Sequence, residues 1–207
     1  MAKILLGSQS PGRKHVLDKF GFLYDTFVPN ANEKSINGNI YLQEAIDLVL
    51  FNSKLKLDTI LAKTPDVTNY SLIITSDTTV FYNNKIYEKT YDKDKARVLL
   101  SELVGKTHQV ITAVTLYITT GQNSDSPQIL SFYDDTKVRI TADQTLIDLY
   151  LRTDDCLGKA GCYGIQGAGS LIIDQLIGSI DNVIGLPIQA ILTHLPLTLL
   201  KNLKSNF

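Results

Sequence analysis

The first stretch that suggests chemistry is ILLGSQSPGRKHVL, residues 4–17, where an apolar run ends in small, hydroxyl-bearing and basic residues. Ser8 and Ser10 supply hydroxyls, Pro11 suits the first turn of a helix, and Arg13 adds a planar fork of donors. The start of a helix also presents free N–H groups and a positive dipole end. The stretch is a candidate site for an anionic small molecule, although a capped helix with surface cations would give the same pattern.

A second candidate is Asp77 in TSDTTV, residues 75–80, which directly follows an apolar run and has Ser76 and Thr78 on either side. Carboxylates are depleted inside strongly β segments. A partly shielded carboxylate at this place could hold Mg²⁺ or accept a proton from water. The alternative is an aspartate in a turn or at a sheet edge.

Further candidates are three lysines and a loop rich in glycine. Lys54, Lys89 and Lys159 would suit an anion that needs several cations, whereas any single lysine is usually a solvated surface charge. The stretch GKAGCYGIQGAGS, residues 158–170, is dense in glycine, which lets a backbone approach a ligand closely. Gln166 can offer a base both a donor and an acceptor. The glycines do not follow the GxGxxG order of dinucleotide-binding loops, and a long loop without a special role remains open.

The motifs of several enzyme classes are missing from the sequence, namely GxxxxGK[ST], HExxH and GxSxG. Cys156 and Cys162 form no CxxC pair and have no histidine nearby, which argues against a zinc site. Their spacing does not exclude a disulfide. A pair of cysteines in a chain long enough to bury its own core nevertheless suits a reducing compartment.

The bulk composition narrows the class of protein. Lysine and arginine number 20 against 21 acidic residues, so there is no basic excess to hold a nucleic acid. No apolar run approaches the roughly 18 residues of a membrane span, and the short apolar stretch near the start is too brief for a signal peptide. We expect a cytoplasmic protein that binds neither nucleic acid nor membrane, with residues 1–207 forming a single domain.

The elements that must position these residues mix β and helical patterns. Strands are expected at 3–8, 72–74, 80–82, 86–87, 107–120, 128–140 and 171–180. Helices are expected from Pro11 to a stop at Gly21 and at 41–63, 92–105, 142–152 and 188–203, the last with a break at Pro196. Asn83–Asn84 is expected as a tight turn, and residues 121–127 as the connection of a hairpin. This order predicts an α/β or α+β protein with a mixed sheet.

Taken together, these residues resemble the Maf family of septum formation and ASMTL-like proteins. The matches run in order along almost the whole chain: SQSPGRKHVL to the family's SPRR opening, Asn32–Glu33, Lys54, SDTTV at 76–80, Lys89, VGKTHQVITAV at 104–114, KAGCYGIQG at 159–167 and NVIGLP at 182–187.

The resemblance implies an α/β fold of the inosine-triphosphatase (Maf/Ham1) type, with two lobes around a deep cleft and frequent homodimers. It also implies a nucleoside triphosphate pyrophosphatase that uses a divalent metal, Mg²⁺ or Mn²⁺. The resemblance gives the catalytic roles to Asp77, Glu33, Lys54 and Lys89, with Asp77 and Glu33 holding the metal, and contacts with the nucleotide to Ser8, Ser10, Arg13, Lys159 and Gln166.

Three departures from the family pattern bear on activity. Gly12 replaces the first arginine of SPRR, Thr90 follows Lys89 in place of proline, and Asp155 stands where glutamate is frequent. Loss of one charge-assisted contact costs about 1.5–3 kcal/mol.

The YGIQG stretch resembles the branch that acts on dTTP, UTP or modified pyrimidine nucleotides. A sister branch acts on 7-methyl-GTP and has a tryptophan in the SPxR loop, whereas this chain has no tryptophan. Two alternatives stay open, a pyrophosphatase of the 7-methyl-GTP type and a nucleotide-binding cell-division regulator with weakened catalysis.

Overall fold

The computed structural model describes residues 3–119 and 126–203. Within these two ranges, seven strands form one sheet in the order β2-β1-β3-β5-β6-β7, with β4 paired to β3. The strands are β1 (Ile4–Leu6), β2 (Tyr24–Thr26), β3 (Leu72–Tyr82), β4 (Lys85–Ile86), β5 (Thr107–Ile118), β6 (Gln128–Ile140) and β7 (Ile173–Ile177).

The helices connect and cover these strands. The α-helices are α1 (Pro11–Lys19), α2 (Leu42–Lys63), α3 (Lys93–Leu103), α4 (Gln144–Leu151), α5 (Ile180–Ile184), α6 (Ile188–Thr193) and α7 (Leu197–Asn202). Three short 3₁₀ helices in the described residues are η1 (Val67–Asn69), η2 (Ala160–Cys162) and η3 (Gly167–Ile172).

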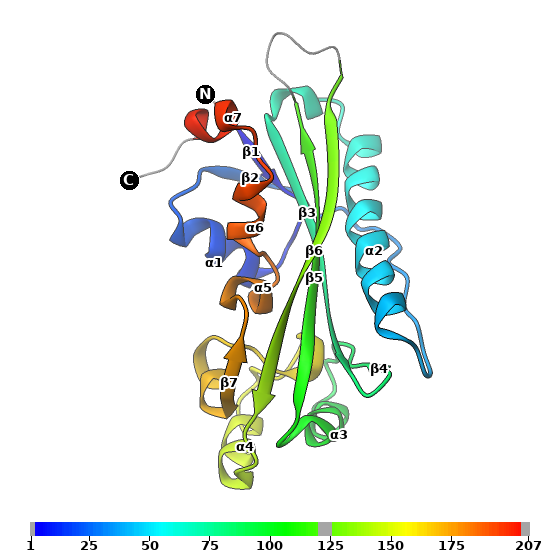
Figure 1. The fold of residues 1–207 in the computed structure, drawn as a ribbon, viewed down its shortest axis with the longest axis vertical. Coiled ribbons are helices and arrows are strands. Elements are labelled where there is room, and N and C mark those ends of the chain that lie inside the picture. The colour runs from blue at the N-terminus through cyan, green and yellow to red at the C-terminus, as the bar shows by residue number, and fades with distance from the viewer. Residues whose placement is uncertain (1–2, 120–125, 204–207) are drawn as a thin grey trace.

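The sheet is mixed, as predicted. β1 lies parallel to both β2 and β3, whereas β3, β5, β6 and β7 are successively antiparallel. The strands β3, β5 and β6 run along the length of the molecule, with α2 on one face and α1, α5 and α6 on the other (Figure 1). β5 and β6 pair from Thr107↔Arg139 to Ile118↔Gln128, as expected for the predicted hairpin. Most of its predicted connection lies outside the described residues.

Successive apolar side chains of the strands point to opposite faces of the sheet, so a core forms on each face. Leu72 and Ile74 pack with α1 and α6, whereas Ile73 between them packs with α2. Because successive strand side chains point to opposite faces, a single buried strand can anchor helices on both sides. This arrangement fixes α1 and α2 relative to β3.

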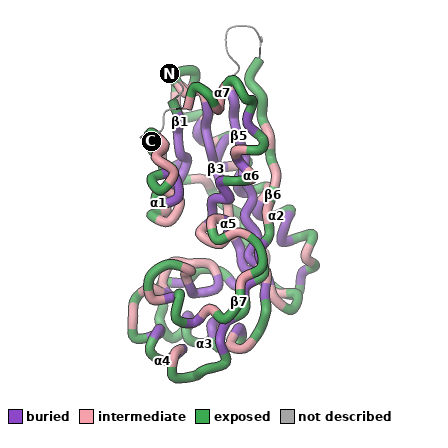
Figure 2. The backbone as a smooth tube through the Cα atoms, turned by 60° about the vertical axis from the view of Figure 1, so that its left-hand side comes forward, coloured by how far each residue is buried: buried purple, intermediate pink, exposed green. Residues whose placement is uncertain are grey.

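A second part of the molecule surrounds the far ends of the long strands, where α3, α4, η2 and η3 share a separate core (Figure 2). Tyr150, Leu100 and Leu103 are fully buried there, against Val80 of β3 and Val138 of β6. The long strands therefore belong to both cores. The deep cleft expected between the lobes stays a prediction.

Several local signals in the sequence are confirmed. Ser10 caps α1 and accepts a hydrogen bond from the Arg13 N–H at 3.4 Å. Asn83 and Asn84 have φ values of 48° and 60°, the left-handed pair that a tight hairpin turn requires. The closing helix is interrupted at Pro196, which caps α7.

Several expected strands differ from the structure. β3 continues without a break from Leu72 to Tyr82, because β5 pairs with it along almost its full length. Asp77 therefore lies inside a strand and not after one. The expected strand 171–180 is shorter, since η3 occupies its start and Gly178, with φ of 130° and packed on Thr136, ends β7.

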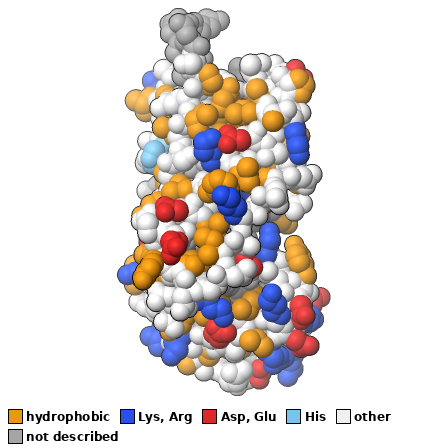
Figure 3. Space-filling view, turned by 90° about the vertical axis from the view of Figure 1, so that its right-hand side faces the viewer, with side chains coloured by type: hydrophobic (Ala, Val, Ile, Leu, Met, Phe, Trp, Pro, Cys, Tyr) orange, Lys and Arg blue, Asp and Glu red, His pale blue; other side chains and the backbone are white. Residues whose placement is uncertain are grey.

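The described helices include none that is both long and apolar enough to cross a bilayer. On the side that carries α2, basic side chains are scattered among acidic and apolar ones and form no single basic area (Figure 3).

Candidate active site

The candidate site lies at a stretch of β3 that has no paired strand on one side. β1 pairs with β3 at residues 72–74 and then ends, and the Gly7 N–H makes a last bond to the Ile74 carbonyl at 2.8 Å. β4 rejoins this edge at Phe81. The intervening part of β3 contains Ser76, Asp77 and Thr78, so groups from both faces of the sheet can approach one another around this edge.

On the α2 face, Asp77 shares one ammonium group with Glu33. Lys56 Nζ lies 2.7 Å from Asp77 Oδ1 and 3.2 Å from Glu33 Oε2. The side chains of Lys56, Asp77 and Glu33 are 8%, 14% and 38% exposed, respectively. Lys56 also donates to the Ser76 carbonyl at 3.1 Å, and Asn52 Nδ2 donates to Asp77 Oδ2 at 3.1 Å. Two carboxylates and one cation thus converge at a half-closed position.

On the opposite face, Arg13 reaches the same stretch of β3. Its Nη2 donates to Thr78 Oγ1 at 3.1 Å, its Nη1 to Ser8 Oγ at 3.3 Å, and its Nε to the Gly185 carbonyl at 2.9 Å. The Ser76 hydroxyl also donates to the Gly185 carbonyl, at 3.1 Å. The guanidinium is therefore held in one orientation by three different segments of the chain.

Gly185 allows this close approach. Its φ is 103°, and a Cβ there would lie 2.8 Å from Thr78 Oγ1 and 3.2 Å from Arg13 Nε. Any larger residue would both strain the backbone and displace the guanidinium.

Arg13 and the acidic pair influence each other electrostatically. Burial lowers the pKa of Arg13 from its usual value, and the negative charges of Asp77 and Glu33 act in the opposite direction. The loop that carries Ser8 and Ser10 completes this side, because the Ser10 N–H donates to Ser8 Oγ at 3.1 Å.

The lysine from α2 at this site is Lys56, whereas the sequence prediction gave the role to Lys54. Lys54 is half exposed and binds Asp58, one turn further along α2, at 2.8 Å. Positions two residues apart in a helix point about 200° apart, so the two lysines cannot share a face. The buried positions Val49, Asn52, Ser53, Lys56, Leu57 and Ile60 form one helical stripe. That periodicity was the signal that could have identified Lys56.

The structure places the remaining predicted residues in the second part of the molecule. Lys89 is exposed and, among the described residues, forms no ion pair. Lys159 Nζ binds the Asp155 carbonyl at 2.6 Å and its carboxylate at 2.8 Å. Gln166 is exposed and precedes η3.

Backbone bonds bring two of these segments side by side. The Gly158 N–H donates to the Thr90 carbonyl and the Gly161 N–H to the Tyr87 carbonyl, each at 2.8 Å. Lys89 and Lys159 thus lie on adjacent loops. No hydrogen bond or ion pair between described residues links Lys89, Lys159 or Gln166 to Asp77.

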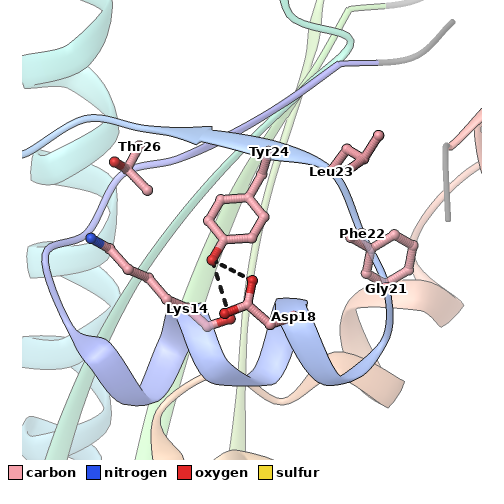
Figure 4. A pocket seen from close by; sticks show the side chains of 7 residues that line it. All are labelled: Lys14, Asp18, Gly21, Phe22, Leu23, Tyr24 and Thr26. Carbon is pink, nitrogen blue, oxygen red and sulfur yellow. Dashed lines mark hydrogen bonds between the residues drawn. The ribbon is translucent and has the colours of Figure 1, made fainter. Parts of the chain in front are cut away.

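Gly12, the position where the family pattern has arginine, faces α5. A Cβ at Gly12 would lie 3.0 Å from the Ile184 side chain. Lys14, a candidate to replace the missing cation, instead lines an open hollow of about 540 Å³ between α1 and β2, together with Asp18 and Tyr24 (Figure 4). Tyr24 spans this hollow and donates to Asp18 Oδ1 at 2.8 Å. None of the predicted site residues lines it.

The acidic pair fits a divalent cation in its chemistry. The Asp77 and Glu33 carboxylates already lie on either side of one positive charge, and carboxylate oxygens are the protein ligands that Mg²⁺ prefers. Within the described ranges, no group of three or more histidine, cysteine or acidic side chains is placed to hold a metal. Both cysteines are buried and unpaired with each other.

Comparison with known proteins identifies the family of this chain. The chain matches the family model of Maf-like proteins over residues 3–197. It is 37% identical to a dTTP/UTP pyrophosphatase of Bacillus pumilus, in an alignment that covers 91% of this chain and 92% of the relative. It is 35% identical to a dTTP/UTP pyrophosphatase of Pyrococcus furiosus, in an alignment that covers 93% of each chain. The solved Ham1 protein of Staphylococcus aureus is 14% identical, with a TM-score of 0.41 over 98% of this chain and 91% of that one. The chain belongs to the Maf-like protein family.

Proposed function

We propose that the protein is a nucleoside triphosphate pyrophosphatase that converts a nucleoside triphosphate to the monophosphate and pyrophosphate. One observation carries this proposal: the Asp77–Lys56–Glu33 cluster and the fixed guanidinium of Arg13 meet at the same stretch of β3. Hydrolysis of a polyphosphate depends mainly on positioning and charge neutralisation. Carboxylates can position a water molecule or a metal ion, and the neighbouring cations can neutralise the charge of the phosphates.

In the proposed reaction, a water oxygen forms a bond to the α-phosphorus and the bond between this phosphorus and the bridging oxygen breaks. The bridging oxygen leaves with pyrophosphate. Asp77 accepts the proton of the water, while Lys56 holds the two carboxylates beside each other and Arg13 binds phosphate oxygens. Ser8 and Ser10 add hydrogen bonds from the loop before α1.

A divalent cation, proposed as Mg²⁺ with Mn²⁺ as the alternative, would be held by Asp77 and Glu33, and it supplies charge neutralisation at the phosphates. Phosphate oxygens and water would provide its other ligands, which is the usual arrangement for Mg²⁺ in nucleotide enzymes.

We propose dTTP, UTP or modified pyrimidine nucleotides as substrates. Support comes from the names of the Bacillus pumilus and Pyrococcus furiosus relatives, both dTTP/UTP pyrophosphatases. Gln166 and the glycine loop around it are proposed to contact the base. Lys89 and Lys159 would reach the phosphates from the second part of the molecule. A homodimer, a cytoplasmic location and a part in septum formation stay predictions.

A nucleotide panel tests this proposal. The protein is incubated with dTTP, UTP, the other common triphosphates and 7-methyl-GTP, with Mg²⁺ or Mn²⁺, and monophosphate and pyrophosphate are quantified. We expect release from dTTP and UTP above the others, and its loss in Asp77→Asn, which keeps the size of the side chain. Preference for 7-methyl-GTP would overturn the pyrimidine assignment. Tight nucleotide binding without release would favour a regulator weakened by Gly12, and full activity of Asp77→Asn would remove Asp77 from its role.

A further inference from the structure

Asn52 is a buried polar residue that the proposed reaction has not yet used. It lies one helical turn before Lys56 on the same face of α2 and is 3% exposed. Its Nδ2 donates to Asp77 Oδ2 at 3.1 Å and to the Lys34 carbonyl at 3.0 Å, and its Oδ1 accepts from the Lys34 N–H at 2.9 Å. Both amide hydrogens and the amide oxygen therefore have partners. A buried side chain that is fully bonded holds those partners in one arrangement.

The partner backbone belongs to a segment with little structure of its own. Residues 27–41, between β2 and α2, form neither helix nor strand. Glu33 is in this segment, next to the residue whose N–H and carbonyl both bind Asn52. Since no ladder of backbone bonds fixes the segment here, the position of Glu33 depends on such side-chain bonds.

The two oxygens of Asp77 are held by two residues of the same helix. Lys56 binds Oδ1 and Asn52 binds Oδ2, so the carboxylate plane has one orientation. Asn52 thus connects three things: the orientation of Asp77, the backbone beside Glu33, and the rigid helix that carries Lys56.

We propose that Asn52 is a positioning residue for the reaction. It fixes the position of the Asp77 carboxylate relative to that of Glu33, and it orients Asp77 to act on water or to bind metal. This inference rests on the proposed function, because the relative placement of Asp77 and Glu33 affects turnover only if that pair acts on substrate.

The variant Asn52→Asp tests it with almost no change in shape. A carboxylate at this position faces the Asp77 carboxylate and the Lys34 carbonyl and can no longer donate to either. Without these bonds, neither the Asp77 carboxylate nor the backbone beside Glu33 keeps its position. We expect kcat to fall at least tenfold, with a much smaller change in the KM for nucleotide.

Ser53→Ala is the matched control, because Ser53 is equally buried on the same helix and binds the Leu50 carbonyl and Thr115 Oγ1 but neither carboxylate. We expect it to lower the melting temperature and to leave kcat within about twofold of the wild-type value. An unchanged kcat in Asn52→Asp would overturn the proposal, and so would an equal loss of kcat in Ser53→Ala.

A second measurement does not depend on activity. Amide hydrogen exchange at Lys34, followed by NMR, reports the bond that Asn52 makes to this backbone. We expect slow exchange in the wild type and in Ser53→Ala, and exchange at least tenfold faster in Asn52→Ala. Equal rates in all three would overturn the proposal. If the wild type releases no pyrophosphate from any nucleotide, the proposed function fails, while the exchange rates still decide whether Asn52 positions the segment.

Discussion

At the scale of single residues, the site depends on one ammonium group shared by two carboxylates. Asp77 and Glu33 both lie within 3.2 Å of Lys56 Nζ, in a position where little solvent reaches Lys56 or Asp77. Charges that are partly removed from water are stable only when they are paired. Lys56 therefore holds the acidic pair together.

Two substitutions distinguish the role of Lys56 in holding the acidic pair from that of an exposed lysine on the same helix. Lys56→Met keeps most of the side-chain volume but leaves two facing carboxylates without a cation, so we expect the unfolding free energy to fall by about 1–3 kcal/mol. Turnover at neutral pH should fall at least tenfold, because two like charges that lose their shared cation repel each other and move apart. Lys54→Met breaks only an exposed pair with Asp58 and should change stability by no more than about 0.5 kcal/mol. Urea unfolding and kinetics check both variants. Equal losses in the two would contradict this assignment.

At the scale of elements, packing tolerates no side chain at some positions of the glycine-rich loop, residues 158–170, and tolerates one at others. A Cβ on Gly169 would lie 1.7 Å from the Gly164 carbonyl oxygen, which is backbone and cannot move aside alone. A Cβ on Gly164 would meet the Cε of Lys159 at 2.9 Å, near the end of a flexible side chain. The two glycines contact each other but differ in how far the structure can adapt to a methyl group.

We therefore expect Gly169→Ala to lower the unfolding free energy by about 3 kcal/mol or more, because the loop must open to admit the methyl group. Gly164→Ala should cost less than about 1 kcal/mol, since the Lys159 side chain can change rotamer. Thermal unfolding of the two variants measures this difference. A Gly169→Ala protein with the wild-type melting temperature would show that the loop does not pack in this way.

The elements also show how far the sequence could predict the site. The cap of α1, the extent of α2 and the Asn83–Asn84 turn follow from local signals and were predicted. The resemblance assigns the helix lysine to Lys54, whereas the helical phase of the buried positions on α2 places Lys56 at the site. The role of Gly185 could not be predicted, since it depends on a meeting of Arg13 with a residue far away in the chain. Contacts of this kind become visible only when tertiary structure is known.

At the scale of the whole molecule, three long strands join the two parts. β3 carries Asp77 near its middle and contributes Ile74 to one core and Val80 to the other. The loops with Lys89 and Lys159 are attached to the second core, so any approach of these lysines to Asp77 must come from the bend or twist of the shared strands or from the loops themselves. The stability of the second core is therefore important for the complete site.

That second core contains a titratable pair whose effect is measurable in the whole protein. His108 is buried, and its Nε2 lies 2.6 Å from the Tyr163 hydroxyl. Burial lowers the pKa of His108 to about 4, against about 6.5 in an unfolded chain. Between these values the unfolded state binds the extra proton, so the unfolding free energy falls as pH drops from about 6.5 to about 4, by about 3 kcal/mol in total. Urea unfolding of the wild type and of His108→Gln across this range isolates the contribution, because other titrating groups are common to both. We expect the unfolding free energy of the wild type to fall steadily relative to that of His108→Gln as the pH drops toward 4. A constant difference would show that His108 takes up its proton as readily in the folded state as in the unfolded state.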